Sequence, residues 1–424
     1  MKKYEKYKEV VLSWLKEIPE GWEVKELGSV FAERREKVSD RDYQPLSVTK
    51  NGVLLQLENV AKTDNGDNRK KVLKDDFVIN SRSDRKGSSG LSNYDGSVSL
   101  INTVLRIRKG NKFFWNYLLK SVPFQEEFYR NGKGIVADLW STGYQAMKKI
   151  NIPIPPLHEQ EQIANFLDWK ISEIDKLINL EKIKINEIKS VKSKIIDKYL
   201  AKDNNKSVKL KFLGTFVKGR GIAREHLIDL GEYPVILYGD IYTKYNYSFS
   251  KVVNRIDFDV FDKSIKIHGN TILFPTSGET KEDIGKTVIY EGSEIVAIGG
   301  DVLAFTVNSE EIDAKYLMYY LNSGESLAYK YVNGRGDIIV HISETSLKEI
   351  VVNFPDVEVQ KSIANKISDK FNDIDSWLDY TNQQIAYFEE LKQTLISDAV
   401  TGKIDVRNIE IPDFIHGKEE AWWI

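Results

Sequence analysis

The chain has no cysteine, almost no net charge and no long apolar run. Without cysteine, neither a disulfide nor a metal site with thiolate ligands can form. No apolar stretch approaches the roughly 18–20 residues that a helix needs to cross a bilayer, and residues 1–22 lack the apolar centre of a signal peptide. We therefore expect a cytoplasmic protein that has no membrane partner.

Local motifs of catalysis are also missing. There is no Gly-x-Gly-x-x-Gly cofactor turn, and Asn151-Ile-Pro-Ile departs from the Asn/Asp-Pro-Pro-aromatic motif of amino-methyltransferases. Gly285-Lys286-Thr287 matches the end of a phosphate loop, but Thr280 stands where the first glycine is required, so we expect a strand after a loop. No metal-ligand spacing occurs among the histidines at 158, 226, 268, 341 and 416. We predict no enzymatic activity, no catalytic residues, no metal site and no cofactor in this chain.

The composition describes a globular chain long enough for two or more domains. It has 424 residues, of which 41% are hydrophobic and 29% charged. Its formal net charge of −2 does not suggest nucleic-acid binding by itself. A DNA-binding function would require basic residues to be concentrated on particular faces or supplied by a partner chain.

One internal repeat of long period is present. The segment from Pro155 to Leu200 aligns without a gap on the segment from Pro355 to Val400, and Gln160 matches Gln360 in the same register. Solenoid repeats have periods of about 20–50 residues, so this repeat indicates a duplicated half-protein instead.

Each copy of the repeat predicts one long helix. Apolar residues recur at alternating steps of three and four over five heptads, without proline or glycine, as in a coiled-coil seam. Such a helix would have about 42 residues and a length of roughly 60 Å. Both copies interrupt the seam at positions 181/381 and 192/392, where polar residues would set the register. The predicted seam consists of Leu167, Ile171, Ile174, Ile178, Ile185, Ile188 and Ile195, and of Ile367, Phe371, Ile374, Leu378, Ile385, Phe388 and Leu395.

Two regions of different character precede the helices. Residues 20–150 and 207–350 have short alternating runs rich in Val, Ile, Tyr and Phe, broken by Gly, Asn, Asp and Ser, which predicts mixed α/β domains. They share a similar opening phrase, Glu26-Leu-Gly28 and Phe212-Leu-Gly214, and a later Asn-Gly-basic-Gly turn at 131–134 and 333–336. The predicted boundaries are 1–150 for the first domain, 151–203 for the first helix, 204–350 for the second domain, 351–402 for the second helix and 403–424 for a C-terminal tail.

This arrangement resembles the specificity subunit of type I restriction–modification systems. The residues that carry the resemblance are the two Gln-x-x-Ile-Ala helix entries, the phrase Ile18-Pro-Glu-Gly-Trp22 and the segment Ile152-Pro-Ile-Pro-Pro-Leu-His-Glu-Gln160. The resemblance covers essentially the whole chain, although residues 353–360 depart from the residue pattern that is usual in the family. The expected fold is α+β, with two mixed α/β target-recognition domains separated by two long helices that pack as an antiparallel coiled coil in a pseudo-twofold repeat.

The resemblance also implies function and partners. Each domain would bind one half of a bipartite, asymmetric site in double-stranded DNA, and the helices would act as a spacer. Two methyltransferase subunits would dock on the helices, and nuclease–translocase subunits would join that core. S-adenosylmethionine would be held by the methyltransferase, and ATP and Mg by the nuclease–translocase.

DNA contacts require cationic or amide side chains beside glycine-permitted loops, from where they reach phosphates or base edges. The candidates in the first domain are Arg69, Lys70, Arg82, Arg85, Lys86 and Lys133. Those in the second are Lys218, Arg220, Arg224, Lys244, Lys281 and Arg335, with Tyr242 and Tyr245 as stacking or groove contacts. A solvated surface charge is the alternative interpretation for each of them.

Two alternatives for the whole chain stay open at this stage. A coiled-coil scaffold with two protein- or ligand-binding domains would explain the helices, but not the matched Gln-x-x-Ile-Ala entries. A self-contained methyltransferase would require cofactor and catalytic motifs, which the sequence lacks. Binding to duplex DNA with a split sequence preference separates the first alternative from the main prediction, and S-adenosylmethionine binding by this chain alone separates the second.

Overall fold

The chain folds into two compact units, of which the first is built from two separate segments of the sequence and the second from one. The computed structural model describes residues 1–56, 66–134, 140–200, 206–278, 280, 283–336 and 339–412. One unit comprises Met1–Glu181 and Gln383–Ile424, and the other comprises Lys182–Asn382. The two long helices, α4 (Leu157–Leu200) and α10 (Val357–Val400), contribute residues to both units. We call the part of the first unit before α4 the first domain, and the part of the second unit between α4 and α10 the second domain.

Short antiparallel strands build the first domain. Its sheets have the strand orders β10-β9-β12-β4, β11-β8-β5, β13-β3, β6-β7 and β1-β2. The strands are β1 (Tyr7–Glu9), β2 (Glu17–Pro19), β3 (Glu23–Glu26), β4 (Phe31–Glu33), β5 (Lys37–Val38), β6 (Leu46–Thr49), β7 (Gly52–Leu55), β8 (Arg69–Val72), β9 (Phe77–Asn80), β10 (Ser89–Leu91), β11 (Gly96–Val98), β12 (Asn102–Ile107) and β13 (Asn151–Ile154). The central strand β9 is apolar and fully buried apart from its last residue, as a strand covered on both faces must be.

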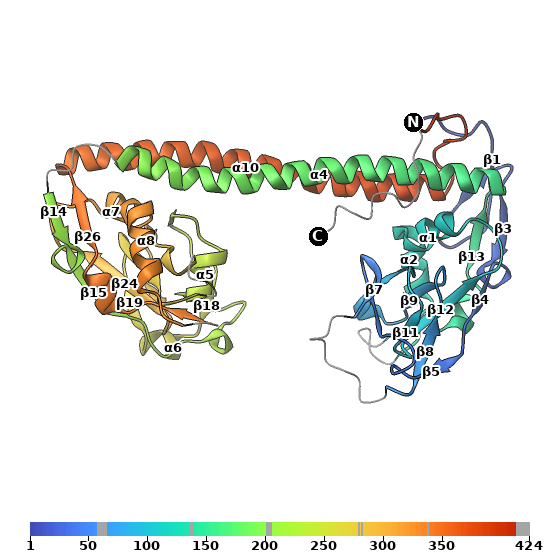
Figure 1. Ribbon diagram of the computed structural model, residues 1–424, viewed down its shortest axis with the longest axis horizontal. Coiled ribbons are helices and arrows are strands. Elements are labelled where there is room, and N and C mark those ends of the chain that lie inside the picture. The colour runs from blue at the N-terminus through green and yellow to red at the C-terminus, as the bar shows by residue number, and fades with distance from the viewer. Residues whose placement is uncertain are drawn as a thin grey trace. The chain divides into compact units, whose positions relative to one another are not determined.

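Three helices complete the first domain: α1 (Lys112–Lys120), α2 (Val122–Arg130) and α3 (Tyr144–Met147). The Asn111 side chain caps α1 by accepting hydrogen bonds from the amides of Phe113 and Phe114. Helices α1 and α2 lie between the sheets and α4 (Figure 1). Their buried aromatic residues join one core with Ile163 and Phe166 of α4. That core also takes in residues near both chain ends, among them Trp22 and Val406.

The second domain is built from two larger sheets and two strand pairs. Their strand orders are β15-β24-β20-β22-β17, β18-β16-β23-β19, β14-β26 and β21-β25. The strands are β14 (Lys206–Lys209), β15 (Gly214–Lys218), β16 (Tyr233–Ile236), β17 (Ser248–Phe249), β18 (Arg255–Ile256), β19 (Ile265–Ile267), β20 (Thr271–Pro275), β21 (Ser277–Gly278), β22 (Val288–Tyr290), β23 (Val296–Ile298), β24 (Val302–Val307), β25 (Val340–His341) and β26 (Val351–Phe354). The helices are α5 (Tyr238–Thr243), α6 (Phe258–Asp262), α7 (Ala314–Tyr320), α8 (Gly324–Asn333) and α9 (Glu344–Lys348).

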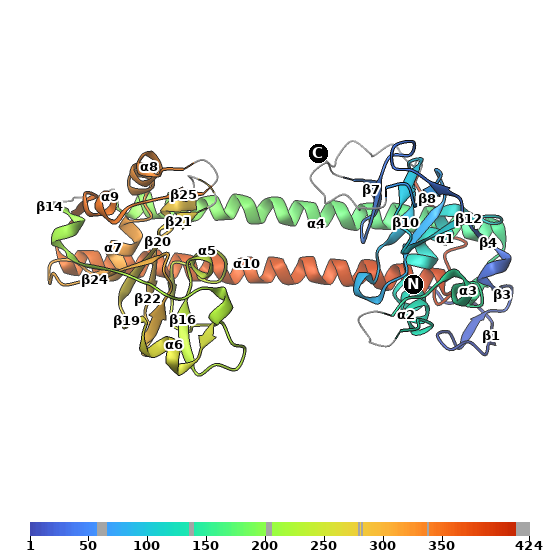
Figure 2. The same ribbon diagram turned by 90° about the horizontal axis from the view of Figure 1, so that it is seen from below.

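In this unit α7 packs against α10, as two views of the ribbon show (Figure 1 and Figure 2). The Tyr319 ring meets Phe371 of α10 edge-on at 5.6 Å, and its hydroxyl is 3.0 Å from Ser368 Oγ. Both domains are therefore mixed α/β, as predicted, and each attaches to the long helices through the first helix after its main sheet.

The repeated glutamines fasten each domain to the start of its long helix. Gln160 is buried, accepts a hydrogen bond from the Asn111 amide at 2.9 Å and donates one to the Pro155 carbonyl at 2.8 Å. Gln360 does the same with the Asp313 amide (2.8 Å) and the Pro355 carbonyl (2.7 Å). Because Asn111 and Asp313 cap α1 and α7, the motif joins the cap of the domain helix to the entry of the long helix.

The predicted seam residues of α4 and α10 are all buried or half-buried. In the first unit, both carboxylate oxygens of Asp175 lie 2.7 Å from Lys392 Nζ. In the second unit, Asp375 pairs with Lys192. The two lysines are the polar interruptions that the heptad pattern marks, and both are used in ion pairs between the helices.

The Leu-Gly pairs of the similar sequences Glu26-Leu-Gly28 and Phe212-Leu-Gly214 do not occupy equivalent positions in the two domains. The amides of Leu27 and Leu210 donate to the carbonyls of Ile150 and Ile350, each at 2.8 Å. The matching residues are thus Leu27 and Leu210. The backbone pairing with β13 and β26 places Leu27 opposite Ile150 and Leu210 opposite Ile350. An alignment of the two Leu-Gly pairs is therefore shifted by three residues from the structural one.

Candidate nucleic-acid interface

Three backbone segments meet side by side at Ser141 in the first domain. Ser141 pairs in antiparallel fashion with Arg82 on one side and with Lys133 on the other. The amide and carbonyl groups of Lys133 and Ser141 exchange hydrogen bonds of 3.2 and 3.1 Å. Residues paired in this way direct their side chains to one face and lie close together. We call Arg82, Ser141 and Lys133 the first-domain triplet.

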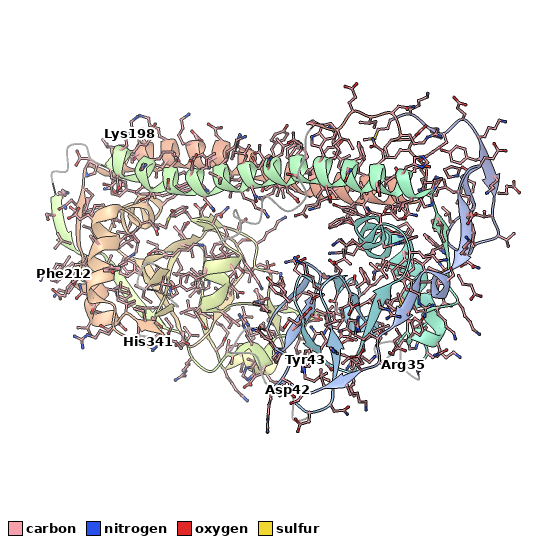
Figure 3. All side chains as sticks on the ribbon, turned by 45° about the vertical axis from the view of Figure 1, so that its right-hand side comes forward. Arg35, Asp42, Tyr43, Lys198, Phe212 and His341 are labelled. Carbon is pink, nitrogen blue, oxygen red and sulfur yellow. The ribbon has the colours of Figure 1, made fainter. Side chains whose placement is uncertain are left out.

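The same arrangement recurs at His341 in the second domain. His341 pairs with Ser277 between β25 and β21, and with Arg335 on its other side. The amide and carbonyl groups of Arg335 and His341 exchange hydrogen bonds of 2.9 and 2.7 Å. His341 Nδ1 lies 3.0 Å from Ser277 Oγ. We call Ser277, His341 and Arg335 the second-domain triplet; Figure 3 labels His341 at the surface of its domain.

A hollow of about 420 Å³ adjoins the first-domain triplet. Two predicted DNA contacts, Lys70 and Arg82, line it together with Ser141. Lys70 Nζ donates to the Asn102 carbonyl at 2.7 Å and lies 3.5 Å from a carboxylate oxygen of Glu33. Arg82 is 3.0 Å from Asp84. The hollow thus holds two cations whose positions are already set by partners in the chain.

A hollow of similar size, about 420 Å³, adjoins the second-domain triplet. Arg224 and Tyr242, both predicted contacts, line it. The Tyr242 hydroxyl donates to the Ser277 carbonyl at 3.1 Å, which ties the wall of the hollow to the triplet. Lys286 also lines it, and its ammonium donates to the Tyr245 carbonyl at 2.7 Å. Burial, with a smaller contribution from Lys192, lowers the pKa of Lys286 to about 8.

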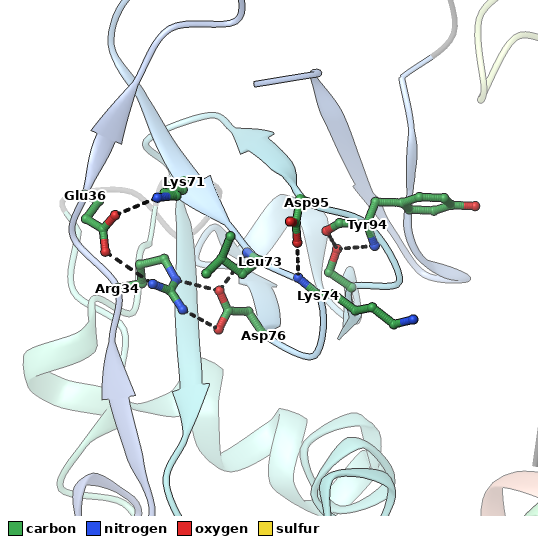
Figure 4. Close-up of polar contacts among 9 residues, drawn as sticks. Arg34, Glu36, Lys71, Leu73, Lys74, Asp76, Tyr94 and Asp95 are labelled. Atoms are coloured by element: carbon green, nitrogen blue, oxygen red, sulfur yellow. Dashed lines mark hydrogen bonds and ion pairs between the residues drawn. The ribbon is translucent and has the colours of Figure 1, made fainter. Parts of the chain in front are cut away.

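Other basic side chains of the first domain are held in ion pairs. Arg85 Nε is 3.8 Å from Asp84, and Lys86 pairs with Glu126. Figure 4 shows a second charged cluster, in which the Arg34 guanidinium binds both carboxylate oxygens of Asp76 at 2.6 and 3.2 Å. The hydrogen bond from Arg34 to Asp76 raises the pKa of Arg34. In these pairs acidic side chains offset the charge of the basic ones, in a chain that has 61 Lys and Arg residues and 63 Asp and Glu residues.

Lys133 and Arg335 differ from these residues. Both side chains are exposed, and neither has an ion pair within the part of the chain that the structure describes. Each stands in the Asn-Gly-basic-Gly turn, where Gly336 adopts a φ of +122° that a residue with a Cβ rarely takes. They are the two predicted contacts that occupy equivalent places in the two domains.

Two predicted contacts are buried, which removes the physical basis for assigning them to DNA. Arg69 is only 5% exposed, and its Nε and a terminal NH2 donate to Ser97 at 2.9 and 3.0 Å. Burial lowers the pKa of Arg69. Tyr245 is also 5% exposed, because its ring stacks on Phe249 with centroids 3.8 Å apart. Residue type alone suggested a surface position for both.

The remaining predicted residues of the second domain lie apart from the triplet. Lys218 and Arg220 are exposed at and just beyond the end of β15. Lys244 lies 2.7 Å from Asn254 Oδ1 and 3.1 Å from Asp240. Lys281 is outside the described residues. These placements do not test whether any of them contacts DNA.

Ser141, Ser277 and Lys286 were not predicted as contacts, and His341 was considered only as a metal ligand. A signal for two of them is present, because Ser141 and His341 are 200 positions apart, as the repeated helices are. The burial patterns from 141 to 147 and from 341 to 347 are identical, with an exposed first residue and a buried second one.

The Gly285-Lys286-Thr287 segment does not form a phosphate loop. Thr287 is fully buried, and its amide donates to the Asn322 side chain at 3.0 Å just before β22. The expectation of a strand after a loop is confirmed. Within the described ranges there is no cluster of three or more potential metal-binding side chains and no helix long and apolar enough to cross a membrane.

Comparison with known proteins identifies relatives of the whole chain. A family model described as type I restriction modification DNA specificity domain matches twice, over residues 19–190 and 202–386. The MjaX protein of Methanocaldococcus jannaschii, whose assignment as a type I restriction enzyme specificity subunit is provisional, is 23% identical over 435 residues, which cover 92% of this chain and 95% of that protein. The MjaVIII specificity subunit of the same organism is 23% identical over 333 residues, covering 73% and 75% of the two chains.

A solved structure from work on "complex assembly" and "conformational transition of the type I R-M system" has a similar fold. It superposes with a TM-score of 0.64 and 14% identity, covering 91% of this chain and 99% of that one. At this identity the similarity establishes the fold alone.

Proposed function

Because the chain belongs to the family of type I restriction–modification DNA specificity subunits, we propose that it binds a bipartite, asymmetric DNA site, one half with each domain. The observation that carries the proposal is the recurrence of the triplet. The two domains have the same backbone pairing around positions 141 and 341, yet place Arg, Ser and Lys in one and Ser, His and Arg in the other. Equivalent frames with unlike side chains suit two unlike half-sites.

The long helices act as the spacer between the two half-sites. We propose that they pack as an antiparallel coiled coil within a pseudo-twofold repeat. The ion pairs support this arrangement, because Lys392 meets Asp175 and Lys192 meets Asp375. In both pairs a residue late in one helix meets a residue earlier in the other, as antiparallel packing requires. A rigid spacer fixes the distance between half-sites, as dimer geometry does for other DNA-binding proteins.

The chain itself is proposed to be non-catalytic. Its partners are double-stranded DNA, two methyltransferase subunits that dock on the helices, and nuclease–translocase subunits. S-adenosylmethionine belongs to the methyltransferase, and ATP and Mg belong to the nuclease–translocase. The Gln160 and Gln360 clamps support two docking surfaces, because they build nearly equivalent helix entries at two places in one chain.

Each proposed DNA surface includes exposed or half-exposed cations around its triplet. In the first domain these are Lys70, Arg82 and Lys133, and in the second they are Arg224 and Arg335. Cations of this kind neutralise phosphates and position the duplex, whereas contacts to base edges specify the sequence. The buried Arg69 and Tyr245 are not part of this proposal.

The test is to map methylated sites by single-molecule sequencing in a genome that carries this chain with its cognate methyltransferase. We expect an asymmetric two-part motif that disappears when the chain is deleted. Replacement of residues 20–150 by the corresponding domain of another family member should change one half of the motif only. The matched control is replacement of residues 207–350, which should change the other half. Methylation that is unaffected by the deletion would contradict the proposal and favour a scaffold function.

A further inference from the structure

The exposed central residue of each triplet has the geometry of a base-contacting group. Ser141 and His341 are both exposed, while the next residues, Thr142 and Ile342, are buried. The buried neighbour anchors the strand to the core and the exposed residue faces outward. Each triplet also lies next to a hollow that holds cationic side chains: Ser141 itself lines the first, and Gly278, the residue after Ser277, lines the second.

We propose that His341 contacts a base in the second half-site and that Ser141 occupies the equivalent position in the first. This inference rests on the proposed function and deepens it, because it names the side chains that determine specificity. Lys133 and Arg335, on the next paired segment, contact the DNA backbone beside them.

The chemistry of His341 supports a contact to a base edge. Its Nδ1 is 3.0 Å from Ser277 Oγ, and this hydrogen bond holds the ring in one orientation. When the hydroxyl donates to Nδ1, the other ring nitrogen, Nε2, carries the hydrogen and is a donor. His341 Nε2 has no hydrogen-bond partner within the described part of the chain. A donor on an exposed edge matches the acceptors of the major groove, which are purine N7, guanine O6 and thymine O4.

The first-domain triplet has different chemistry on the same frame. The Ser141 hydroxyl donates a hydrogen bond to Ser81 Oγ at 2.9 Å. The serine side chain is also shorter than that of histidine. The neighbouring Arg82 is longer and has the planar donor pair that binds guanine O6 and N7. Beside its central residue the first domain therefore presents the Arg82 guanidinium, whereas the second presents the His341 imidazole next to the short Ser277 hydroxyl. This difference provides a physical reason for two unlike half-sites on one scaffold.

The experiment uses the complete methyltransferase complex and three variants of the second domain. His341→Ala removes the imidazole, and Arg335→Ala removes the neighbouring cation. Lys263→Ala is the matched control, because Lys263 is an exposed basic residue at the end of α6, outside the hollow and the triplet. Methylation motifs are mapped, and binding is measured by competition between duplexes that differ at single positions of each half-site.

For His341→Ala we expect discrimination to fall on the order of 10-fold at one position of the second half-site, with the first half-site unchanged. Arg335→Ala should weaken binding to all duplexes about equally and reduce the salt dependence of log K by about one unit. Lys263→Ala should change neither. If His341→Ala abolishes methylation altogether, the competition assay still decides, because a flattened preference at one second-half position supports the inference.

Unchanged relative affinities at every second-half position in His341→Ala would overturn the inference. So would an equal loss at both half-sites. These outcomes are distinct from failure of the proposed function, since the domain replacements would still change one half of the motif. Ser141→His offers the reciprocal test, with the expected change confined to the first half-site.

Discussion

The ion pair between Lys192 and Asp375 is expected to hold the register of the two long helices. Breaking it should lower the free energy of unfolding by a measurable amount. The side chain of Lys192 is 9% exposed and that of Asp375 is 32% exposed. The Lys192 ammonium also lies 5.0 Å from the centre of the Phe371 ring. Replacing Lys192 by Met leaves a half-buried carboxylate that keeps a long hydrogen bond of 3.5 Å from the Asn246 side-chain amide.

Removal of one partner of a fully buried pair costs about 3–5 kcal/mol. Since a third of Asp375 is accessible to water, we expect Lys192→Met to lower the free energy of unfolding by about 2–3 kcal/mol. Each kcal/mol shifts the melting temperature by roughly 2–4 °C in a unit of this size. The double substitution Lys192→Met with Asp375→Leu should recover most of the loss, because an apolar pair can replace a buried ion pair.

The matched control is the equivalent pair in the first unit. The Asp175 side chain is 30% exposed, much like Asp375, but Lys392 is 28% exposed whereas Lys192 is 9% exposed, so water screens this pair more strongly. Lys392→Met should therefore cost no more than about 1 kcal/mol. Calorimetry and chemical unfolding of the four chains measure these differences. Equal losses in Lys192→Met and Lys392→Met, or no recovery in the double variant, would refute the reasoning from burial.

Three further predictions concern the clamp, a buried lysine and the exposed cations. Gln360→Ala removes the acceptor of the Asp313 amide and should lower the free energy of unfolding by about 2–3 kcal/mol; a loss below 0.5 kcal/mol in chemical unfolding would argue against the clamp. Burial lowers the pKa of Lys330 to about 7 from its ordinary 10.5, so between these pH values the unfolded chain binds a proton that the folded chain does not. The free energy of unfolding should then rise from pH 7 to 10 relative to Lys330→Met, and parallel profiles for the two chains would contradict this. Lys133→Ala and Arg335→Ala should each reduce the salt dependence of DNA binding by about one phosphate contact, measured by titration at several salt concentrations; an unchanged slope would place the residue away from DNA.

The sequence predicted the long helices well because their determinants are local. Heptad spacing, the absence of proline and glycine, and the repeat itself all lie within one segment of chain. The predicted length of about 42 residues compares with 44 in both α4 and α10. The marked polar positions Lys192 and Lys392 proved to be the residues that form ion pairs.

The candidate interface was predicted only in part, because charge is an imperfect guide to exposure. Lys133 and Arg335 were found from their glycine-rich turns, and both are exposed. Arg69 was misjudged because Ser97 satisfies donors of its guanidinium inside the sheet. In a short sequence of alternating polar and apolar residues, nothing distinguishes an arginine that will be buried from one that will be exposed.

The amino-acid sequence by itself determined the duplication, the two long helices and the family, since each follows from residues near one another or from a repeated order of residues. Only the tertiary structure decided which side chains share a face. Arg82 and Ser141 are brought together by strand pairing across a long stretch of chain, and so are Ser277 and His341. No local pattern encodes such a partner, because backbone hydrogen bonds pair strands with little regard to side-chain identity, and packing of the whole domain selects the register.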